Sequence, residues 1–291
     1  MACSSTRCRW WWAPWPPTAS GSSRWWSTKG GRASPSGGRR EPPHPVRRFF
    51  VRPDAVEEGR VRFDADETRH LQRVLRLGAG ARIEATDGAG RSFVVRLLAV
   101  EGDGAVGLIE TEGAATGESP CAITLGQAIL KGDRMTWLVQ KATELGVARI
   151  VPLDTARVVA RPGPGGEAGA RRRRWERVAR EAMKQCGRGV APVVDEPRPL
   201  AALVEETPRH DTAWLFWEGG GDPVGSAARE AGRPRRLLVL VGPEGGFTGE
   251  EVALARGAGI RVVSLGPRTL RAESAGLVAV ALCQHAFGDL G

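Results

Sequence analysis

The sequence lacks any apolar run close to twenty residues, so no segment is long enough to cross a membrane as a helix. Its five cysteines include no Cys-x-x-Cys pair, and its four histidines have no mutual spacing that suggests a metal site. We therefore expect neither a membrane partner nor a metal. Scattered cysteines are typical of reduced thiols, which favours a cytoplasmic location.

Motifs of common nucleotide-binding and nucleophilic enzymes are also absent. The glycine-rich residues 242–246 (Gly-Pro-Glu-Gly-Gly) lack the Gly-Lys-Ser/Thr of a P-loop, and they do not form Gly-x-Gly-x-x-Gly. No Ser-His-Asp or Cys-His pattern is present. A nucleotide-binding module that grips phosphates is therefore the least favoured function.

The first 45 residues differ in composition from the rest. They hold six of the ten tryptophans among Ser, Pro, Gly and Arg, without helical or strand periodicity. Seven basic residues face a single acid there, so most of the net charge of +9 lies in this stretch. We predict that residues 1–45 are a disordered extension, or an artefact of an upstream start codon with the protein beginning near Val46. A transit peptide is an alternative, whereas the prolines and arginines argue against a secretory signal.

Residues 46–112 have the pattern of a small β-domain. Five short strands are expected, at 48–51, 60–63, 82–86, 92–97 and 105–109. One helix is expected at 67–77, and the turn at 87–90 (Asp-Gly-Ala-Gly) predicts a hairpin. These elements indicate a small β-barrel with one helix, followed by a linker at 113–120.

From residue 121 to 291 strands alternate with helices, which is typical of an α/β fold with a parallel sheet. The expected strands are at 122–129, 149–153, 190–195, 212–217, 237–241 and 261–265. The expected helices begin after an N-cap at Asp133, at 171, at 200, after a capping box of Thr248 with Glu251, and at 274. The last helix is apolar nearly all round, so we expect it to be buried on every side, against the sheet and a second subunit.

Two glycine-bearing loops, at residues 242–246 and 266–270, each follow a hydrophobic strand. We expect these strands to be neighbours in a parallel sheet, so that both loops border one crevice at its carboxyl edge. Glycine lets backbone groups approach a ligand closely, and Arg268, Arg271 and Glu273 lie in or just after the second loop. This arrangement predicts a small-molecule pocket beside an anionic substrate. A tight turn with solvated charges is the alternative.

Two groups of basic residues are candidates for contact with nucleic acid. The first group shares one face of the helix at 171–186, without an acid in that stripe: Arg173, Arg177, Arg180 and Lys184. The second group lies in the β-domain: Arg47, Arg48, Arg69, Arg73 and Arg76. A plain solvent-facing surface explains the helix stripe equally well.

Four motifs occur in a fixed order. They are residues 131–135 (Lys-Gly-Asp-Arg-Met) with 140–147 (Gln-Lys-Ala-Thr-Glu-Leu-Gly-Val), 181–188 (Glu-Ala-Met-Lys-Gln-Cys-Gly-Arg), 241–247 (Val-Gly-Pro-Glu-Gly-Gly-Phe) and 265–275 (Leu-Gly-Pro-Arg-Thr-Leu-Arg-Ala-Glu-Ser-Ala). Together they resemble the RsmE family of SPOUT-superfamily methyltransferases, and the similarity spans residues 47–291. Thr269 stands where the family often has isoleucine, and Ser274 where it usually has threonine. We expect either residue to preserve binding.

The resemblance implies an α/β fold, with a SPOUT α/β-knot (trefoil knot) methyltransferase domain at 121–291 preceded by a PUA-like RNA-binding β-barrel domain at 46–112. It also implies a homodimer that methylates N3 of a uridine in the 16S rRNA of the small ribosomal subunit. The implied cofactor is S-adenosyl-L-methionine, bound by Leu215, Glu218, Gly242, Pro243, Glu244, Gly245, Gly246, Leu265, Gly266, Leu270, Ser274 and Ala275. The expected RNA-binding residues are Arg47, Arg48, Arg73, Arg76, Arg173, Arg177, Arg180, Lys184 and Arg188.

Methylation of uracil N3 requires removal of the imide proton and stabilisation of negative charge on O2 and O4. We expect Glu273 to act as the general base. Arg268 or Arg271 would stabilise the developing charge in a water-poor site. Alternatively, Glu273 only orients Arg271 or caps the last helix.

Two other functions stay open at this point. The same cofactor could serve methylation of a ribose 2′-hydroxyl or of a transfer RNA base, which nucleoside identification would separate from N3 methylation. Alternatively, the chain is a non-catalytic RNA-binding ribosome-assembly factor. That function predicts no methyl transfer onto small-subunit RNA.

Overall fold

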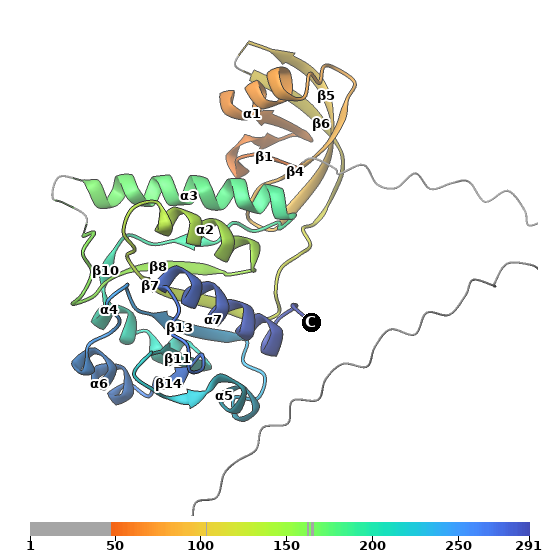
Figure 1. The fold of residues 1–291 in the computed structure, drawn as a ribbon. Coiled ribbons are helices and arrows are strands. Elements are labelled where there is room, and N and C mark those ends of the chain that lie inside the picture. The colour runs from red at the N-terminus through yellow and green to blue at the C-terminus, as the bar shows by residue number, and fades with distance from the viewer. Residues whose placement is uncertain (1–47, 103, 162, 164–165) are drawn as a thin grey trace, which may run out of the picture. The chain divides into compact units, whose positions relative to one another are not determined.

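The computed structural model describes residues 48–102, 104–161, 163 and 166–291. The expected extension at 1–45 and the candidate RNA contact Arg47 lie outside these residues. The described chain forms two sheets (Figure 1). None of its described helices is long and apolar enough to cross a membrane.

The first sheet has six strands in the order β1-β4-β5-β6-β3-β2, and within it β1 and β4 pair in parallel. Its strands are β1 (Arg48–Phe50), β2 (Val56–Glu57), β3 (Arg60–Phe63), β4 (Arg82–Thr86), β5 (Arg91–Glu101) and β6 (Gly104–Ala114). Phe49 and Phe93 lie in its buried core. The predicted hairpin is confirmed, because β4 and β5 are antiparallel and Asp87 Oδ1 accepts the N–H groups of Ala89 and Arg91 at 2.9 and 3.0 Å.

The helical part of this region begins earlier and ends earlier than the predicted 67–77. After a short 3₁₀ turn, η1 (Pro53–Ala55), helix α1 (Ala65–Arg69) continues directly into a π-helix, η2 (His70–Val74). Asp64 accepts the N–H of Glu67 at 2.9 Å and so caps α1. This cap sets the start of the helix. Strand β6 extends into the predicted linker at 113–120.

The second sheet is entirely parallel, in the order β10-β8-β7-β13-β11-β14-β12, with β9 paired to β8. Its strands are β7 (Ala122–Ala128), β8 (Arg149–Asp154), β9 (Val193–Val194), β10 (Arg198–Pro199), β11 (Thr212–Phe216), β12 (Asp222–Pro223), β13 (Arg236–Val241) and β14 (Arg261–Ser264). A parallel sheet with helical connections confirms the predicted α/β class.

The strands that precede the two glycine-bearing loops, β13 and β14, are not neighbours, so this prediction is wrong. Strand β11 lies between them, because Leu215 pairs with Leu240 on one side and with Val262 on the other. Strand order in a parallel sheet is set by the crossover connections, which a local pattern does not reveal. The carboxyl ends of three strands therefore border this edge, rather than those of two.

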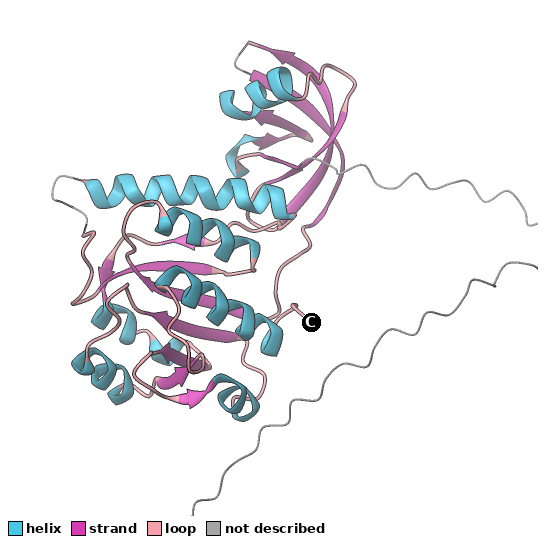
Figure 2. Cartoon of the chain, in the orientation of Figure 1, coloured by secondary structure: helices cyan, strands magenta, loops and turns pink. Residues whose placement is uncertain are grey.

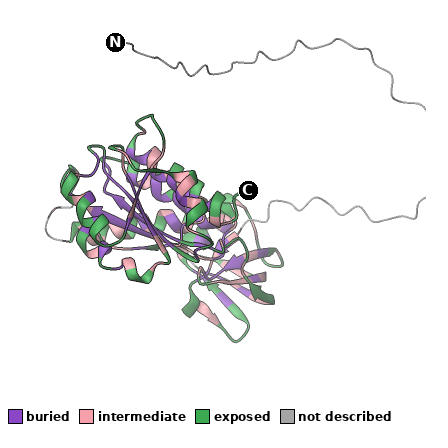
Figure 3. Cartoon of the chain, turned by 90° about the horizontal axis from the view of Figure 1, so that it is seen from below, coloured by how far each residue is buried: buried purple, intermediate pink, exposed green. Residues whose placement is uncertain are grey.

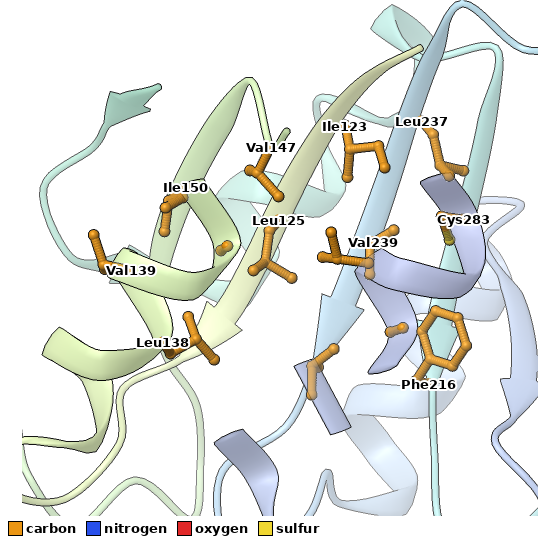
Figure 4. Packing of buried hydrophobic residues seen from close by; sticks show 14 of the residues in the cluster. Ile123, Leu125, Leu138, Val139, Val147, Ile150, Phe216, Leu237, Val239 and Cys283 are labelled. Carbon is orange, nitrogen blue, oxygen red and sulfur yellow. The ribbon is translucent and has the colours of Figure 1, made fainter. Parts of the chain in front are cut away.

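Helices cover both faces of the second sheet (Figures 1 and 2). One face carries α2 (Arg134–Glu144), α3 (Glu167–Cys186), α5 (Val224–Glu230) and α7 (Ala272–Phe287), and the other carries α4 (Leu200–Val204) and α6 (Gly249–Gly257). Figure 4 shows Leu138 of α2 and Cys283 of α7 packed on the first face beside Leu125 and Val239. The strands are buried on both faces, while the outer sides of the helices are exposed (Figure 3).

Local signals predicted several helix ends and missed others. The capping box is confirmed, with reciprocal bonds of 3.2 and 2.8 Å between Thr248 and Glu251. Asp133 precedes α2 as predicted, but its carboxylate accepts a bond from Arg174 at 2.8 Å instead of capping the helix. Helix α3 begins at Glu167 rather than near residue 171, and α5 has no counterpart among the predicted helices. A 3₁₀ turn, η3 (Thr207–Arg209), follows α4.

The last helix, α7, is apolar on nearly all sides, as predicted. One face packs against the sheet through Ala279, Val280 and Cys283. In the single chain, however, Val278 and Leu282 are exposed. The predicted burial on every side required a second subunit as well as the sheet, so for the outer face of α7 it stays a prediction.

Candidate functional site

A pocket opens at the carboxyl edge of the second sheet, where β11, β13 and β14 end. The segments that follow these strands form its walls, together with the first turn of α7. Nine residues predicted to bind the cofactor line it: Glu218, Gly242, Pro243, Glu244, Gly246, Leu265, Gly266, Leu270 and Ala275. The fold therefore brings both glycine-bearing loops to one cavity.

Three residues of the predicted cofactor set do not line this pocket. Leu215 is fully buried among the core residues on the α4/α6 face of the sheet, because alternate residues of a strand point to opposite faces. The carbonyl of Gly245 accepts a bond from Arg157 Nη1 at 2.6 Å. Ser274 borders a separate surface hollow beside α2. The side chain of Leu215 thus belongs to the core, and a contact of its backbone with the cofactor stays a prediction.

Six further residues complete the wall of the pocket and were absent from the predicted set. They are Phe216, Trp217, Val241, Ser264, Thr269 and Ala272. Phe216 ends β11, the strand that lies between β13 and β14, and Trp217 follows it. The predicted set already included Leu215 and Glu218 on either side of these two aromatic residues, so the segment was identified although the two side chains were not.

The glycines of the first loop leave a cradle that side chains would fill. A Cβ added to Gly246, which has a φ of +69°, would lie 1.7 Å from Glu218 Oε1. A Cβ added to Gly242 would lie 3.1 Å from the backbone nitrogen of Phe247. The positive φ of Gly246 favours glycine there, and a side chain at Gly242 would crowd the backbone of Phe247, so the loop offers backbone N–H and C=O groups to a ligand. These features fit a nucleoside cofactor held by main-chain groups.

Gln127 is hydrogen-bonded to the first glycine-bearing loop. Its side chain is fully buried at the end of β7, and its Nε2 donates to the carbonyl of Gly242 at 3.1 Å. A Cβ added to Gly276 of α7 would lie 2.5 Å from Gln127 Oε1. Gln127 thus supports both the glycine loop and the close approach of α7, and the sequence motifs did not indicate it.

A second, open hollow lies beside the pocket, between the starts of α2 and α7. It is lined by Asp133, Arg134, Trp137, Arg271, Glu273 and Ser274. Two of the three predicted catalytic residues, Arg271 and Glu273, lie here, whereas Arg268 lines the pocket itself. The structure thus places the three in adjacent cavities rather than in one.

Glu273 is the chemically distinctive residue of this hollow. Its side chain is buried, with 9% of the residue exposed, and its Oε2 has no hydrogen-bond partner within the described chain. A buried carboxylate oxygen without a partner is costly. A hydrogen-bond donor that reached this buried oxygen would satisfy it.

Arg134 is the cation nearest to Glu273 among the ion pairs of the described chain, and it was not among the predicted site residues. Its Nε lies 3.8 Å from Glu273 Oε1, and its Nη1 lies 3.2 Å from Glu244 Oε1. Glu244 Oε1 also accepts the backbone N–H of Lys131 at 3.1 Å. One guanidinium thus connects the pocket wall with the first turn of α7.

The predicted arginine stripe on α3 divides into two parts. Arg173 and Arg177 are exposed and form no ion pair within the described residues. Arg180 lies with its guanidinium 4.9 Å from the centre of the Phe50 ring. These three positions remain candidates for RNA contact.

The side chain of Lys184, the fourth member of the stripe, is only 8% exposed and pairs with Glu67 at 2.5 Å and Glu181 at 2.9 Å. Burial by itself would lower the pKa of Lys184, but the charge of Glu67 together with hydrogen bonds to Glu67 and Glu181 outweighs burial, and the pKa is raised. Burial also raises the pKa of Glu67, against the opposing charge of Lys184. Lys184 is therefore corrected from an RNA contact to a buried ion-pair residue.

Arg188 is also corrected to a structural residue. It is 4% exposed, pairs with Glu118 at 2.6 Å, and donates to the carbonyls of Thr143 and Val147, each at 2.9 Å. A guanidinium saturated in this way has no free face for RNA. The motif at 181–188 gave no signal for this burial, because its partners come from distant segments.

The β-domain candidates also differ in their surroundings. Arg48 is partly buried, pairs with Glu84 at 3.1 Å, and donates to the carbonyl of Gly187. Arg73 and Arg76 are exposed and form no ion pair in the part of the chain that the structure describes. Arg48 is thus occupied by protein contacts, while Arg73 and Arg76 are free to meet a ligand. In the described ranges, no cluster of three His, Cys, Asp or Glu residues could hold a metal ion.

Comparisons with known proteins identify the family. A model for the RNA methyltransferase domain matches residues 117–284, and one for the RNA methyltransferase PUA domain matches residues 63–110. The ribosomal RNA small subunit methyltransferase E of Synechocystis sp. is 32% identical over 236 residues, which cover 80% of this chain and 76% of that protein. The protein of the same name from Mycobacterium bovis is 32% identical over 224 residues, or 75% of this chain and 83% of that protein.

A solved structure shows the same fold. The ribosomal RNA small subunit methyltransferase E from Neisseria gonorrhoeae, bound to S-adenosyl methionine, superimposes with a TM-score of 0.76 at 32% identity. The match covers 84% of this chain and 100% of that one. Fold and site together define the class of RNA methyltransferases that carry a PUA domain. Within this class, the chain belongs to the ribosomal RNA small subunit methyltransferase E family.

Proposed function

We propose that this protein transfers a methyl group from S-adenosylmethionine to N3 of a uridine in the 16S rRNA of the small ribosomal subunit. The observation that carries the proposal is the glycine-walled pocket at the sheet edge, next to a buried carboxylate with one unpartnered oxygen. Membership of the methyltransferase E family supports the same reaction. A ribosomal substrate also favours a cytoplasmic location.

The cofactor fits the pocket by the chemistry of its walls. Gly242 and Gly246 open main-chain groups to the nucleoside, and Phe216, Trp217 and Leu265 provide apolar surface. The sulfonium of S-adenosylmethionine supplies the electrophilic methyl group. The remaining tasks, proton removal and charge stabilisation at the acceptor, fall to residues of the chain.

Glu273 is the proposed general base. Its carboxylate, which lines the hollow, accepts the imide proton of uracil N3, a role that contributes about 10²–10⁴-fold in rate. Arg268 and Arg271, both exposed, stabilise the negative charge that spreads onto O2 and O4. The bases flanking the target reach the site along surfaces that include Arg73, Arg76, Arg173 and Arg177.

We further propose that α7 faces a second copy of the chain. Val278 and Leu282 are exposed on a helix whose opposite side is packed against the sheet. A homodimer would bury both side chains. Sedimentation velocity tests this: wild type should be dimeric and Leu282→Glu monomeric, whereas a monomeric wild type at micromolar concentration would reject the dimer.

The trefoil knot implied by the family resemblance also belongs to the proposal. After β14, which lies beyond β11, the chain returns across the sheet and places α7 against β7 and β13. Such a return crossing is what a knot in this segment requires, although knots are rare in proteins.

Methyl transfer to small-subunit particles that lack the modification tests the proposed function. Labelled S-adenosylmethionine is the donor, and nucleosides are identified after digestion. Label in 3-methyluridine is the expected result. Label in a 2′-O-methylated nucleoside, or only in transfer RNA, would reassign the acceptor. Cofactor binding without any transfer would favour a ribosome-assembly factor.

A further inference from the structure

Arg134 occupies a position that neither the cofactor pocket nor the proposed base explains. It is the first residue of α2, and its guanidinium lies between two carboxylates, at 3.2 Å from Glu244 and 3.8 Å from Glu273. Glu244 belongs to the glycine loop that forms the cofactor wall, and Glu273 belongs to the first turn of α7. Arg134 therefore connects the wall of the cofactor pocket with the residue proposed to act on the uridine.

The two carboxylates depend on this bridge to different degrees. Glu244 is half-exposed and has a second donor, the backbone N–H of Lys131, so it keeps a partner without Arg134. Glu273 is buried, and Arg134 is its ion-pair partner within the described chain. Because a buried charge needs a nearby counter-charge, loss of Arg134 affects Glu273 more strongly.

The geometry also separates the two oxygens of Glu273. Arg134 lies beside Oε1, and Oε2 has no partner. A guanidinium beside one oxygen restricts the orientation of the carboxylate, while the other oxygen stays buried and unpaired. Lysine at this position would keep the positive charge, but it would lack the planar guanidinium group whose nitrogens pair with two carboxylates at once.

We propose that Arg134 is a positioning residue that orients the Glu273 carboxylate and ties its position to the cofactor loop through Glu244. This inference rests on the proposed function, since it acts through the proposed base. Arg134 itself touches neither donor nor acceptor in this role. It sets the geometry in which Glu273 meets the uracil N3–H.

The experiment compares Arg134→Gln, Arg134→Lys, Glu273→Gln and the double variant Arg134→Gln/Glu273→Gln with wild type. Single-turnover methyl transfer gives the rate and the apparent affinity for RNA, and calorimetry gives the Kd of S-adenosylmethionine. Lys141→Gln is the matched control, because Lys141 lies on the same helix and pairs with Glu144, which lines neither cavity. Thermal unfolding checks that each variant is folded.

Arg134→Gln should lower the rate by about 10- to 100-fold, the scale of lost orientation in a catalytic group, with RNA affinity within about threefold. Its Kd for S-adenosylmethionine should rise by a few-fold, because Glu244 loses one partner. Arg134→Lys should recover part of the rate. In the Glu273→Gln background, Arg134→Gln should add less than about twofold, since residues that act as one unit are non-additive. Lys141→Gln should match wild type.

Two results would overturn the inference while leaving the proposed function intact. The first is an Arg134→Gln rate within about twofold of wild type. The second is a full additional loss in the double variant, which would show that Arg134 acts independently of Glu273. Failure of wild type itself to bind the cofactor or to transfer methyl would overturn the proposed function and this inference together.

Discussion

Two clusters of charged residues lie at opposite edges of the second sheet, and they differ in their ion pairing. The closed cluster comprises Arg149, Asp195, Arg198 and Glu206, near the amino end of β8. Arg149 pairs with Asp195 at 2.6 Å and with Glu206 at 2.7 Å, and Arg198 pairs with Glu206 at 2.7 Å. Asp195 also lies 3.5 Å from Arg198, and Glu206 lies 3.9 Å from Arg209, so each carboxylate is paired with at least two guanidinium groups. Nε and Nη2 of Arg198 have no hydrogen-bond partner among the described residues.

The open cluster comprises Arg134, Glu244 and Glu273, at the carboxyl edge. Here one guanidinium serves two carboxylates, at 3.2 and 3.8 Å, and one oxygen of the buried Glu273 has no partner. These ion pairs are longer than the three pairs of 2.6–2.7 Å in the closed cluster. A buried polar atom without a partner calls for an explanation, and beside a cavity a bound ligand can supply the missing partner.

The pKa shifts of the closed cluster follow from its hydrogen bonds. A hydrogen bond from Arg149 is the largest contribution, and with that from Arg198 it overcomes burial and lowers the pKa of Glu206 to about 2. The hydrogen bond to Asp195 raises the pKa of Arg149 above its ordinary value. The comparison therefore predicts that changes in the closed cluster alter stability, and that changes in the open cluster alter catalysis.

The largest expected effect is that of Glu273→Gln. Removing the base should lower the methylation rate by about 10²–10⁴-fold. The free energy of unfolding should change by less than about 1 kcal/mol, since the open cluster contributes little to stability. Methyl-transfer kinetics and chemical denaturation measure the two quantities. A rate within a few-fold of wild type, with intact folding, would rule out Glu273 as the base.

Arg268→Ala should have the next largest effect, a loss of about 10²–10³-fold in turnover, the scale of one removed charge-stabilising donor. Its Kd for S-adenosylmethionine should stay within a few-fold, because main-chain groups dominate the pocket. Kinetics and calorimetry give both numbers. An equal loss in turnover and cofactor affinity would assign Arg268 to the pocket instead.

Breaking the closed cluster with Glu206→Gln should destabilise the protein by about 3 kcal/mol, because it leaves Arg149 and Arg198 partly unneutralised in a buried site. The activity of the folded fraction should be unchanged. Chemical denaturation measures the loss. Glu230→Gln is the control, since its pair with Arg261 is exposed and is worth less than about 1 kcal/mol. A similar loss of unfolding free energy in Glu206→Gln and Glu230→Gln would mean that the closed cluster stabilises the protein no more than an exposed ion pair does.

The closed cluster also predicts a pH dependence of stability. Glu206 has a pKa of about 2 in the folded state against an ordinary value of 4.5, so the unfolded state binds more protons between these values. Stability is therefore present above pH 4.5 and is lost as the pH falls toward 2. Denaturation at several pH values should show this loss, with a weaker slope in Glu206→Gln. Parallel slopes would assign the dependence to other carboxylates.

The smallest expected effect concerns the exposed part of α3. Replacing Arg173 and Arg177 with Gln should weaken RNA binding and reduce the slope of log K against log salt by about 0.9 for each lost phosphate contact with duplex RNA. Arg229→Gln, an exposed position on α5, is the control. Salt titrations of RNA binding measure the slopes. An unchanged slope would mean that both arginines are only solvated.

The sequence predicted those parts of the fold that depend on neighbours along the chain. The hairpin at Asp87 and the capping box at Thr248 are confirmed because their hydrogen bonds join residues a few positions apart. The two glycine-bearing loops were recognised for the same reason, and most of the residues taken from them line the pocket. Helix α5 was missed because its seven residues carry only a weak local signal.

Contacts between distant segments were beyond the reach of local patterns. In the sequence, Lys184 and Arg188 have the pattern of an exposed basic face. In the structure both are buried, and their partners Glu67 and Glu118 lie 117 and 70 residues away along the chain. Arg134 gave no sign of a role at the site, because Glu244 lies 110 residues further along the chain.

By itself, the sequence determined the helix and strand periodicities, the caps and turns, and the motifs that mark the family. Only the tertiary structure decided that β11 lies between β13 and β14, that Glu273 is buried with one free oxygen, and that Arg134 stands beside it. The physical reason is that propensity and capping act within a few residues, whereas burial and charge pairing depend on which distant segments the packed sheet brings into contact.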